Sequence, residues 1–286
     1  MLTQERTLPF NYTIGIPMIF YWLIICIFGI SLIRTKSLTK KVRIFILVVT
    51  VLLGIIFGGL PNPLMPIQQT LIALGVKQIV LFLIPAWMIL SLLFVTSYLA
   101  GRVFCGYACP LGAWQELLSS INFKSDMKSQ KRAKLRIDLP TKLATRIRWI
   151  FLVSLFFLAF VFNWILLEEI NPFTGFSSLQ SINSFVITLP FIALTIVSVT
   201  SIFLYRPWCR FLCPFGAGSA FFARFSEDKY IRTDACTDCK LCEQICPTQE
   251  AYRDSLKGEC YYCNRCVEIC PQNAIQYAKP ISSKIN

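Results

Sequence analysis

Residues 236–247 read CTDCKLCEQICP, and residues 260–271 repeat this pattern as CYYCNRCVEICP. In each copy, three cysteines are separated by two residues each, and a fourth follows after three more residues, directly before a proline. Three thiolates on a tight loop can bind three irons of a cubane, and in two-cluster chains with this spacing the fourth cysteine binds the other copy's cluster. The spacing therefore predicts one [4Fe–4S] cluster held by Cys236, Cys239, Cys242 and Cys270, and another held by Cys260, Cys263, Cys266 and Cys246.

Two other interpretations of these eight cysteines are weaker. A disulfide framework requires an oxidising compartment, whereas the charge distribution described below places this segment in the cytoplasm. Zinc ribbons use paired C-x2-C knuckles and lack a triple repeat that ends in Cys-Pro. The chain has no histidine, which also excludes His-ligated haem, His-bound zinc or copper, and an imidazole acid or base.

A second cysteine motif also occurs twice, 104 residues apart, as RVFCGYACPLGA (residues 102–113) and RPWCRFLCPFGA (residues 206–217). The residue before a proline is pushed out of the helical region, and proline favours the first position of a helix. We therefore expect Cys109 and Cys213 to cap the helices that follow them. A thiol in that position, beside an arginine, is expected to have a depressed pKa.

The internal repeat could bring Cys105, Cys109, Cys209 and Cys213 together at one site. Four thiolates there suit a third redox centre, either an iron–sulfur cluster or another thiophilic metal. The alternative is that these cysteines are reduced and pack as small apolar side chains, but packing alone does not require the same arginine, aromatic residue, proline and glycine around both pairs. Cys26 stands alone and is interpreted as a buried apolar side chain.

The composition indicates a membrane protein. Of 286 residues, 55% are apolar and 15% charged, against about 25% charged in soluble chains, and the mean hydropathy is +0.60. Five runs without Lys, Arg, Asp or Glu are long enough to span a bilayer. They are Ile14–Ile33, Ile44–Leu60, Gln78–Ala100, Trp149–Leu167 and Phe185–Leu204. The first is read as a permanent anchor rather than a cleaved signal peptide, because its apolar run is too long and no small-residue cleavage pattern follows.

Basic residues predict the orientation of these spans. Residues 34–43 hold five Lys or Arg, residues 101–148 hold ten, and those after 205 hold eleven, whereas the remaining connections hold only Arg6 and Lys77. Because basic loops stay on the cytoplasmic side, the amino terminus is predicted outside and the carboxy terminus inside. The stretch 124–148 is accordingly read as a solvated cytoplasmic loop against anionic lipid, not as a nucleic-acid site.

The predicted fold is a membrane all-α domain of five transmembrane helices with an internal pseudo-repeat, plus a small α+β bacterial-type 2[4Fe–4S] ferredoxin domain. The expected divisions are residues 1–43 (first span and basic loop), 44–225 (two helix-hairpin repeats, each ending in C-x3-C-P) and 226–286 (cytoplasmic ferredoxin domain). The connections predicted to lie outside the cytoplasm also share a motif, because Asn-Pro occurs at residues 62–63 and again at residues 171–172.

Three further predictions concern single residues. Trp114, Leu117, Leu118 and Ile121 recur at helical spacing and predict a short helix lying in the membrane interface. Arg102 and Arg206 either hold the cysteine site electrostatically or anchor to lipid headgroups. Glu168 and Glu169 either accept protons from a quinol or form an acidic helix end at the interface, of which the second interpretation is favoured.

The paired C-x3-C-P motifs around residues 105–109 and 209–213, followed by the ferredoxin segment, resemble the NapH/MauN-type membrane ferredoxin proteins, whose core the larger NosR and CcoG proteins share. The resemblance covers about residues 44–286. It implies a quinol-linked electron carrier, or an assembly factor that feeds electrons to a metalloenzyme. The chain lacks the large periplasmic flavin-binding domain of NosR, so no flavin is expected.

These observations together favour an electron-transfer subunit that relays electrons between the quinone pool and a partner redox enzyme at the cytoplasmic membrane, in which bound clusters rather than side chains carry the chemistry. The expected partners are other redox subunits, quinone and membrane lipid. One alternative is a maturation factor that reduces or binds a metal such as copper through the C-x3-C-P thiolates, although methionine and histidine tracts are absent. Another is a subunit of an ion-translocating complex, although the spans contain no ionisable residue.

Overall fold

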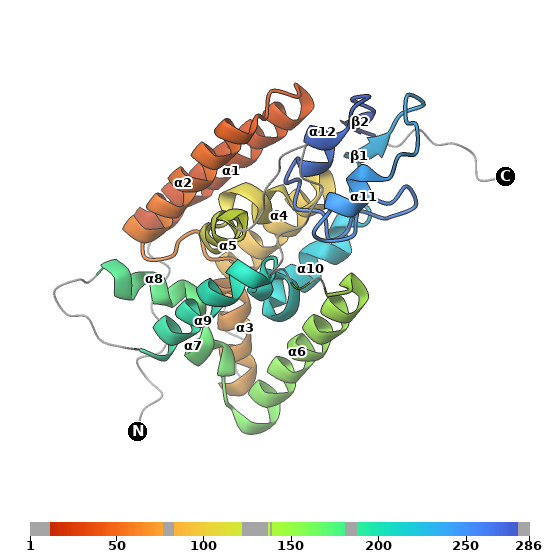
Figure 1. Cartoon of the computed structure of the whole chain (residues 1–286). Coiled ribbons are helices and arrows are strands. Elements are labelled where there is room, and N and C mark those ends of the chain that lie inside the picture. The colour runs from red at the N-terminus through yellow and green to blue at the C-terminus, as the bar shows by residue number, and fades with distance from the viewer. Residues whose placement is uncertain (1–11, 77–82, 122–136, 138, 181–187, 280–286) are drawn as a thin grey trace.

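The computed structural model of this chain describes residues 12–76, 83–121, 137, 139–180 and 188–279. Its described part is mostly helical, and Figure 1 shows two short strands with helices α11 and α12 gathered at one end of a helical bundle. Helix α1 (Tyr12–Arg34) precedes two similar series of helices that follow one another along the chain.

The order of elements repeats along the chain. The first series is α2 (Lys40–Ile56), α3 (Met65–Val76), α4 (Ile84–Ala100), the π-helical turn η2 (Phe104–Ala108) and α5 (Pro110–Ile121). The second is α6 (Thr141–Phe162), α7 (Leu166–Ile170), α8 (Pro172–Gln180), α9 (Leu189–Phe203), the π-helical turn η4 (Trp208–Leu212) and α10 (Pro214–Ala223). Apart from α7, each element of one series has a counterpart in the other.

The two series interlock rather than lie apart. Helix α5 of the first packs against α9 of the second, and α10 of the second packs against α4 of the first. Likewise α3 contacts α6, and α2 contacts α8. Helices α5 and α10, which follow the two Cys-Pro pairs, therefore each pack against a helix of the other series. This arrangement brings both C-x3-C-P motifs into one buried core.

The Asn-Pro pairs predicted as outer turns have a defined structural role. The Oδ1 atom of Asn62 accepts a hydrogen bond from the backbone N–H of Leu64 at 2.9 Å, and that of Asn171 accepts one from Phe173 at 3.1 Å. Such side-chain turns favour a change of chain direction. They lead into α3 and α8, so the outer connections that contain these two pairs include helices.

The five-span prediction is not confirmed by helix length. Among the described residues only α6 is long and apolar enough to cross a bilayer, with 22 residues and a mean hydropathy of 1.8. Helices α4 and α9 have 17 and 15 residues, and at 1.5 Å per residue they reach roughly 22–26 Å against the ~30 Å of a hydrocarbon core. Helix α1 has 23 residues, of which Phe20–Arg34 form an apolar stretch.

The predicted span Trp149–Leu167 is wrong at both ends. Helix α6 begins at Thr141 and ends at Phe162, because Asn163 adopts a left-handed conformation with φ of 51° and its backbone N–H returns to the carbonyl of Leu158. Such a residue caps a helix and stops it. The helix therefore includes the basic residues of its first turns, among them Arg148, which is fully buried and not part of a solvated loop.

The helix predicted from Trp114 and its neighbours forms as α5, but it lies within the bundle rather than in the membrane interface. Gln115, Glu116 and Ser119 are buried, whereas Ile121 is 68% exposed. Helix α5 packs against α2 and α9 and does not lie flat on the surface of the bundle. Its polar face is turned inward because the interior there is charged, as described below.

The ferredoxin segment has the predicted α+β architecture. Strand β1 (Lys229–Arg232) pairs antiparallel with β2 (Ile275–Ala278), with Tyr230 opposite Tyr277, and between them lie α11 (Leu241–Ile245) and α12 (Arg265–Ile269). The segment packs directly on the bundle. Tyr107 of η2 donates a 2.6 Å hydrogen bond to the carbonyl of Tyr262, and the side chain of Asn264 donates one to the carbonyl of Leu38.

Candidate iron–sulfur sites

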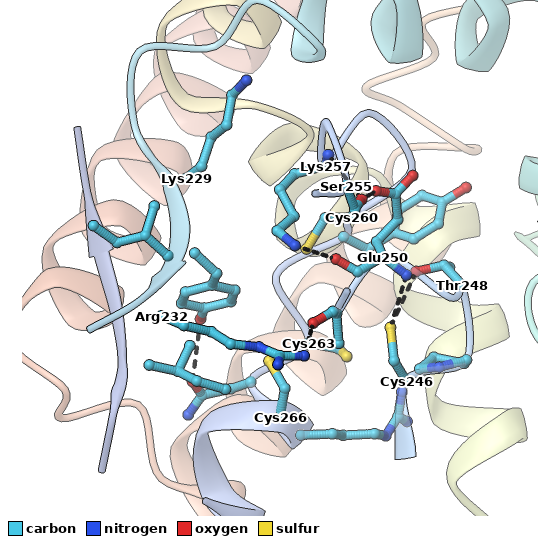
Figure 2. Close-up of a pocket in the computed structure, with 18 of the residues that line it drawn as sticks. Lys229, Arg232, Cys246, Thr248, Glu250, Ser255, Lys257, Cys260, Cys263 and Cys266 are labelled. Atoms are coloured by element: carbon cyan, nitrogen blue, oxygen red, sulfur yellow. Dashed lines mark hydrogen bonds between the residues drawn. The ribbon is translucent and has the colours of Figure 1, made fainter. Parts of the chain in front are cut away.

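The ferredoxin segment encloses a cavity of about 260 Å³ that is lined by four cysteines of the predicted second set. They are Cys246, Cys260, Cys263 and Cys266, and Figure 2 shows their sulfurs around one space. Cys246 comes from the first copy of the motif and the other three come from the second. Its sulfur accepts a hydrogen bond from the backbone N–H of Glu250 at 3.3 Å.

A smaller cavity is lined by the other four cysteines, Cys236, Cys239, Cys242 and Cys270. Here Cys270 is the residue contributed by the opposite copy, and its sulfur accepts a 3.3 Å hydrogen bond from the backbone N–H of Ala274. This contact is the counterpart of the one at Cys246. Since Cys239 is exposed, this cavity is the one nearer to the surface of the protein.

The backbone of both cysteine loops explains why the thiols converge. Asp238 and Lys240 have φ of 49° and 58°, and Tyr262 and Asn264, at the same positions of the second copy, have φ of 54° and 62°. Residues other than glycine rarely adopt such angles, and clusters of them mark functional sites. The two left-handed residues in each loop curl it, so that its cysteines face inward.

The donor set fits iron–sulfur clusters. Among the described residues, no three Cys, Asp or Glu side chains lie close enough together to hold one ion. Each thiolate of a cubane binds a different iron, so its ligands stand farther apart than those of a lone ion. Each cavity offers four thiols as ligands, which suits this type of cluster.

The C-x3-C-P motifs form a third group of thiols in the core of the bundle. Cys105, Cys109, Cys209 and Cys213 are each about 5–6% exposed and belong to one packed cluster of residues. Cys109 and Cys213 have extended backbones immediately before the helices α5 and α10, as the following prolines predict. The sulfur of Cys213 accepts a hydrogen bond from the backbone N–H of Gly216 at 3.3 Å and so caps α10.

The expected lowering of thiol pKa is wrong for these residues. Burial raises the pKa of Cys109, Cys209 and Cys213 above the ordinary value, and neighbouring thiols raise it further at each of them. The free thiols of Cys109, Cys209 and Cys213 are therefore protonated at neutral pH. Metal binding requires the thiolate and so releases protons, which makes the site a poor nucleophile but still a suitable set of ligands.

The two motif arginines are buried, which makes their interpretation as headgroup anchors wrong. Arg102 and Arg206 are 0% and 1% exposed. The guanidinium of Arg206, from the second motif, donates to the carbonyl of Cys105 in the first at 2.7 Å. In the opposite direction, Nη2 of Arg102 lies next to Gly216 of the second motif, 3.1 Å from where a Cβ on that glycine would be. Arg206 thus holds the cysteine loop of the first motif, and Arg102 packs against the second motif.

Two buried carboxylates pair with these arginines and tie the ferredoxin segment to the bundle. Glu259, directly before Cys260, accepts from Arg102 at 2.6 Å and also from Arg148 of α6. The pKa of the Glu259 carboxyl would be raised by burial, but Arg148 and Arg102 outweigh that effect and lower it. The carboxylate therefore stays ionised and bridges three segments of the chain.

Glu116 of α5 makes the matching bridge in the other half of the site. It accepts from Arg206 at 2.9 Å, from Arg265 of α12 at 2.6 Å and from the Tyr205 hydroxyl at 2.6 Å. Burial would raise the pKa of the Glu116 carboxyl, but Arg265 and Arg206 lower it to about 2. Four buried guanidinium groups thus face two carboxylates, which leaves an excess of positive charge beside the thiols.

Buried hydrogen-bond donors without partners also surround the C-x3-C-P thiols. Among the described residues, Nε and Nη2 of Arg102 and Nε1 of Trp208 are fully buried and donate to nothing. Such groups are rare in native proteins and call for an explanation, of which a bound ion is one. Together with the excess positive charge, they fit an anionic, sulfur-rich group at this site.

Sequence reasoning missed the residues that complete this network. Glu116, Glu259, Arg148 and Arg265 lie far from their partners in the chain, and none is matched by the same residue in another copy of a motif. The one available signal was the arginine at the start of each C-x3-C-P motif, because a charge beside an apolar span requires a counter-charge.

Replacing Gly106 by alanine is expected to destabilise the protein by about 1–3 kcal/mol, as overpacking does in other cores. A Cβ at this position, between Cys105 and Cys109, would lie 2.5 Å from the carbonyl oxygen of Tyr261, a backbone atom that cannot rotate away. The midpoint of denaturant unfolding measures the effect. Gly29→Ala is the control, since its added Cβ meets only ordinary contacts from 3.6 Å; equal effects of both variants would refute the predicted clash.

Comparison with known families agrees with this geometry. A model described as a 4Fe-4S binding domain matches residues 80–128 and 186–232, which contain the two C-x3-C-P motifs, and a second 4Fe-4S binding domain model matches residues 257–276. No solved structure matches the chain significantly. The fold and the matched cysteine segments define a ferredoxin-type iron–sulfur protein of electron transport.

Three relatives extend the comparison. The ferredoxin-type protein NapH of Haemophilus influenzae is 26% identical over 64% of this chain and 64% of its own length. Protein NirI of Paracoccus denitrificans is 28% identical over 82% of this chain but 35% of NirI, and the regulatory protein NosR of Stutzerimonas stutzeri is 32% identical over 58% and 23%. The chain spans less than two thirds of each of these relatives. These similarities support a relationship to the NapH-type membrane ferredoxin proteins.

Proposed function

We propose that this chain is a membrane-anchored relay that passes electrons between the quinone pool and a partner redox enzyme. One centre would be held by Cys105, Cys109, Cys209 and Cys213 in the bundle. Two [4Fe–4S] clusters would be held by the ferredoxin segment, on the two cysteine sets that line its cavities. The clusters supply the redox chemistry, and the protein holds them, excludes water and sets their surroundings.

The observation that carries this proposal is the direct connection between the two kinds of cysteine site. Glu259 precedes Cys260, and Arg265 precedes Cys266, so both residues belong to the cysteine loop of the ferredoxin segment. Glu259 forms a buried ion pair with Arg102 of the first C-x3-C-P motif, at 2.6 Å. Arg265 forms one with Glu116 of α5, the helix that follows this motif, also at 2.6 Å. A redox site in the bundle would therefore be in tight contact with a redox site in the ferredoxin segment.

The proposed order of the sites follows their exposure. The cysteines in the bundle are buried, and Cys239 in the outer ferredoxin cavity is exposed. A partner protein would exchange electrons at the exposed end, and a quinone at the end within the bilayer. The 4Fe-4S family model that covers both C-x3-C-P motifs favours a third iron–sulfur cluster over the copper-handling alternative.

We place α1, α2, α4, α6 and α9 in the membrane, with the amino terminus outside and the ferredoxin segment in the cytoplasm. Each helix turns large apolar side chains away from the protein, for example Ile27 (65% exposed), Phe45 (68%), Met88 (66%), Ile150 (69%) and Ile196 (58%). Exposed apolar surface of this extent marks contact with lipid or protein. The basic segments around these helices orient them by the positive-inside bias.

Iron counting and quinol reduction test the proposed function. Anaerobically purified protein in detergent is expected to hold about twelve irons and as many sulfides per chain, whereas clusters in the ferredoxin segment alone would give about eight. Addition of a reduced quinone analogue is expected to produce EPR signals of reduced [4Fe–4S] clusters, and oxidised quinone should remove them. Metal-free protein, or clusters that never exchange electrons with quinone, would refute the relay.

A further inference from the structure

The ring of Tyr261 lies between the two motif arginines. The guanidinium carbon of Arg102 is 4.3 Å from the centre of this ring, and that of Arg206 is 4.4 Å from it. The residue is 2% exposed. Contacts of a guanidinium with an aromatic face are favourable, and more so where water is excluded. Because the two arginines occupy the same position of the two motifs, the ring sits where the halves of the internal repeat meet.

The same residue connects the thiols of the bundle with those of the ferredoxin segment. It is bonded to Cys260, whose thiol lines the larger ferredoxin cavity. Its carbonyl oxygen lies against Gly106, 2.5 Å from where a Cβ would be, within the loop between Cys105 and Cys109. Arg206, which contacts the ring, donates at 2.7 Å to the carbonyl of Cys105. One residue therefore spans the gap between the two sites.

The neighbouring Tyr262 has similar burial but a different direction. Its ring packs against Tyr230 and Tyr277, with centroid distances of 5.3 and 5.4 Å, and its hydroxyl donates to the carbonyl of Asp228. These contacts lie within the ferredoxin segment. Of the two adjacent tyrosines, only Tyr261 directs its ring toward the motif arginines.

We propose that Tyr261 is the positioning residue for electron transfer between the centre on the C-x3-C-P cysteines and the cluster on Cys246, Cys260, Cys263 and Cys266, an inference that rests on the function proposed above. In this step, one electron leaves the reduced centre and enters the oxidised cluster. No bond forms or breaks, no proton moves, and the tyrosine is not itself oxidised. The packed ring and its two guanidinium contacts fill the space that the electron must cross.

The test compares Tyr261→Leu with Tyr261→Phe in the full-length protein. Rapid reduction with a quinol analogue, followed by freeze-quench EPR, measures how fast the electron equilibrates between the two sites. Leucine removes the ring and is expected to slow this equilibration at least about tenfold, whereas phenylalanine keeps the ring and should stay within about twofold of wild type. Tyr262→Leu is the matched control, an equally buried tyrosine in the same loop, and is expected to leave the rate unchanged.

Iron content and the EPR signals of each variant are recorded first. If wild-type protein lacks the bundle centre, the proposed function fails, and the inference about Tyr261 fails with it. If all centres are present, the inference is overturned when Tyr261→Leu equilibrates as fast as Tyr262→Leu, or when Tyr261→Phe is as slow as Tyr261→Leu. Should the leucine variant fail to fold, Tyr261→Met replaces it, because methionine also lacks a ring and is flexible. This variant is expected to slow the equilibration to the same extent.

Discussion

Replacing Glu116 by glutamine is expected to lower the free energy of unfolding by about 3–5 kcal/mol, the cost of removing one partner from a buried ion pair. The side chain is 3% exposed, and its carboxylate neutralises Arg206 and Arg265, which are 1% and 2% exposed. An amide can accept hydrogen bonds from these groups but cannot balance their charge. Two buried cations would then repel each other at the contact between the bundle and the ferredoxin segment.

Denaturant unfolding of the purified protein in detergent, followed by circular dichroism, measures this effect. The control is Glu227→Gln, which also removes a glutamate that pairs with a basic residue, here Lys279 at 2.7 Å, but with side chains 44% and 69% exposed. An exposed pair contributes about 0–1 kcal/mol. If both variants unfold at the same denaturant concentration as wild type, the buried network around Glu116 does not stabilise the fold as described.

Replacing Cys209 by serine is expected to remove one cluster, so that the iron content falls from about twelve to about eight per chain. The Cys209 sulfur lies in the buried group of C-x3-C-P thiols and accepts a hydrogen bond from the Gln115 side chain at 3.3 Å. A serine hydroxyl is nearly isosteric but is a poor ligand for iron. The ferredoxin cavities are lined by other cysteines, so their EPR signals should persist.

Cys26→Ser provides the matched control, because Cys26 is a buried cysteine of the same packed core that belongs to neither motif. It is expected to keep the full iron content. Iron and acid-labile sulfide analysis of both variants, purified without oxygen, decides the outcome. Equal iron in Cys209→Ser and wild type would show that the C-x3-C-P thiols hold no cluster, while the ferredoxin clusters would be unaffected by that result.

Features of the local backbone and of the ligand sets could be predicted because neighbouring residues determine them. The extended backbones at Cys109 and Cys213 follow from the prolines after them, and the sharing of Cys246 and Cys270 between the two ferredoxin cavities follows from the spacing of eight cysteines. Each depends on a few consecutive residues and on the geometry of one turn. The helix at residues 110–121 was found for the same reason.

The orientation of that helix was not predictable, and neither was the end of α6. Apolar periodicity places the apolar face inward only when the interior is apolar, and α5 instead faces a charged interior with Glu116. The end of α6 depends on Asn163 adopting a left-handed backbone, although the residues after it are as apolar as those before. Hydropathy could not detect either feature.

The sequence alone was sufficient to predict iron–sulfur chemistry, because the type and the spacing of the cysteine ligands are determined within short segments of the chain. Three-dimensional packing decided how the redox segments are joined. The partners Arg206 and Glu116 are 90 positions apart, and Arg102 and Glu259 are 157 apart. Charge pairing has no periodicity along a chain, so only the folded interior, where an unpaired charge is costly, selects which carboxylate meets which arginine.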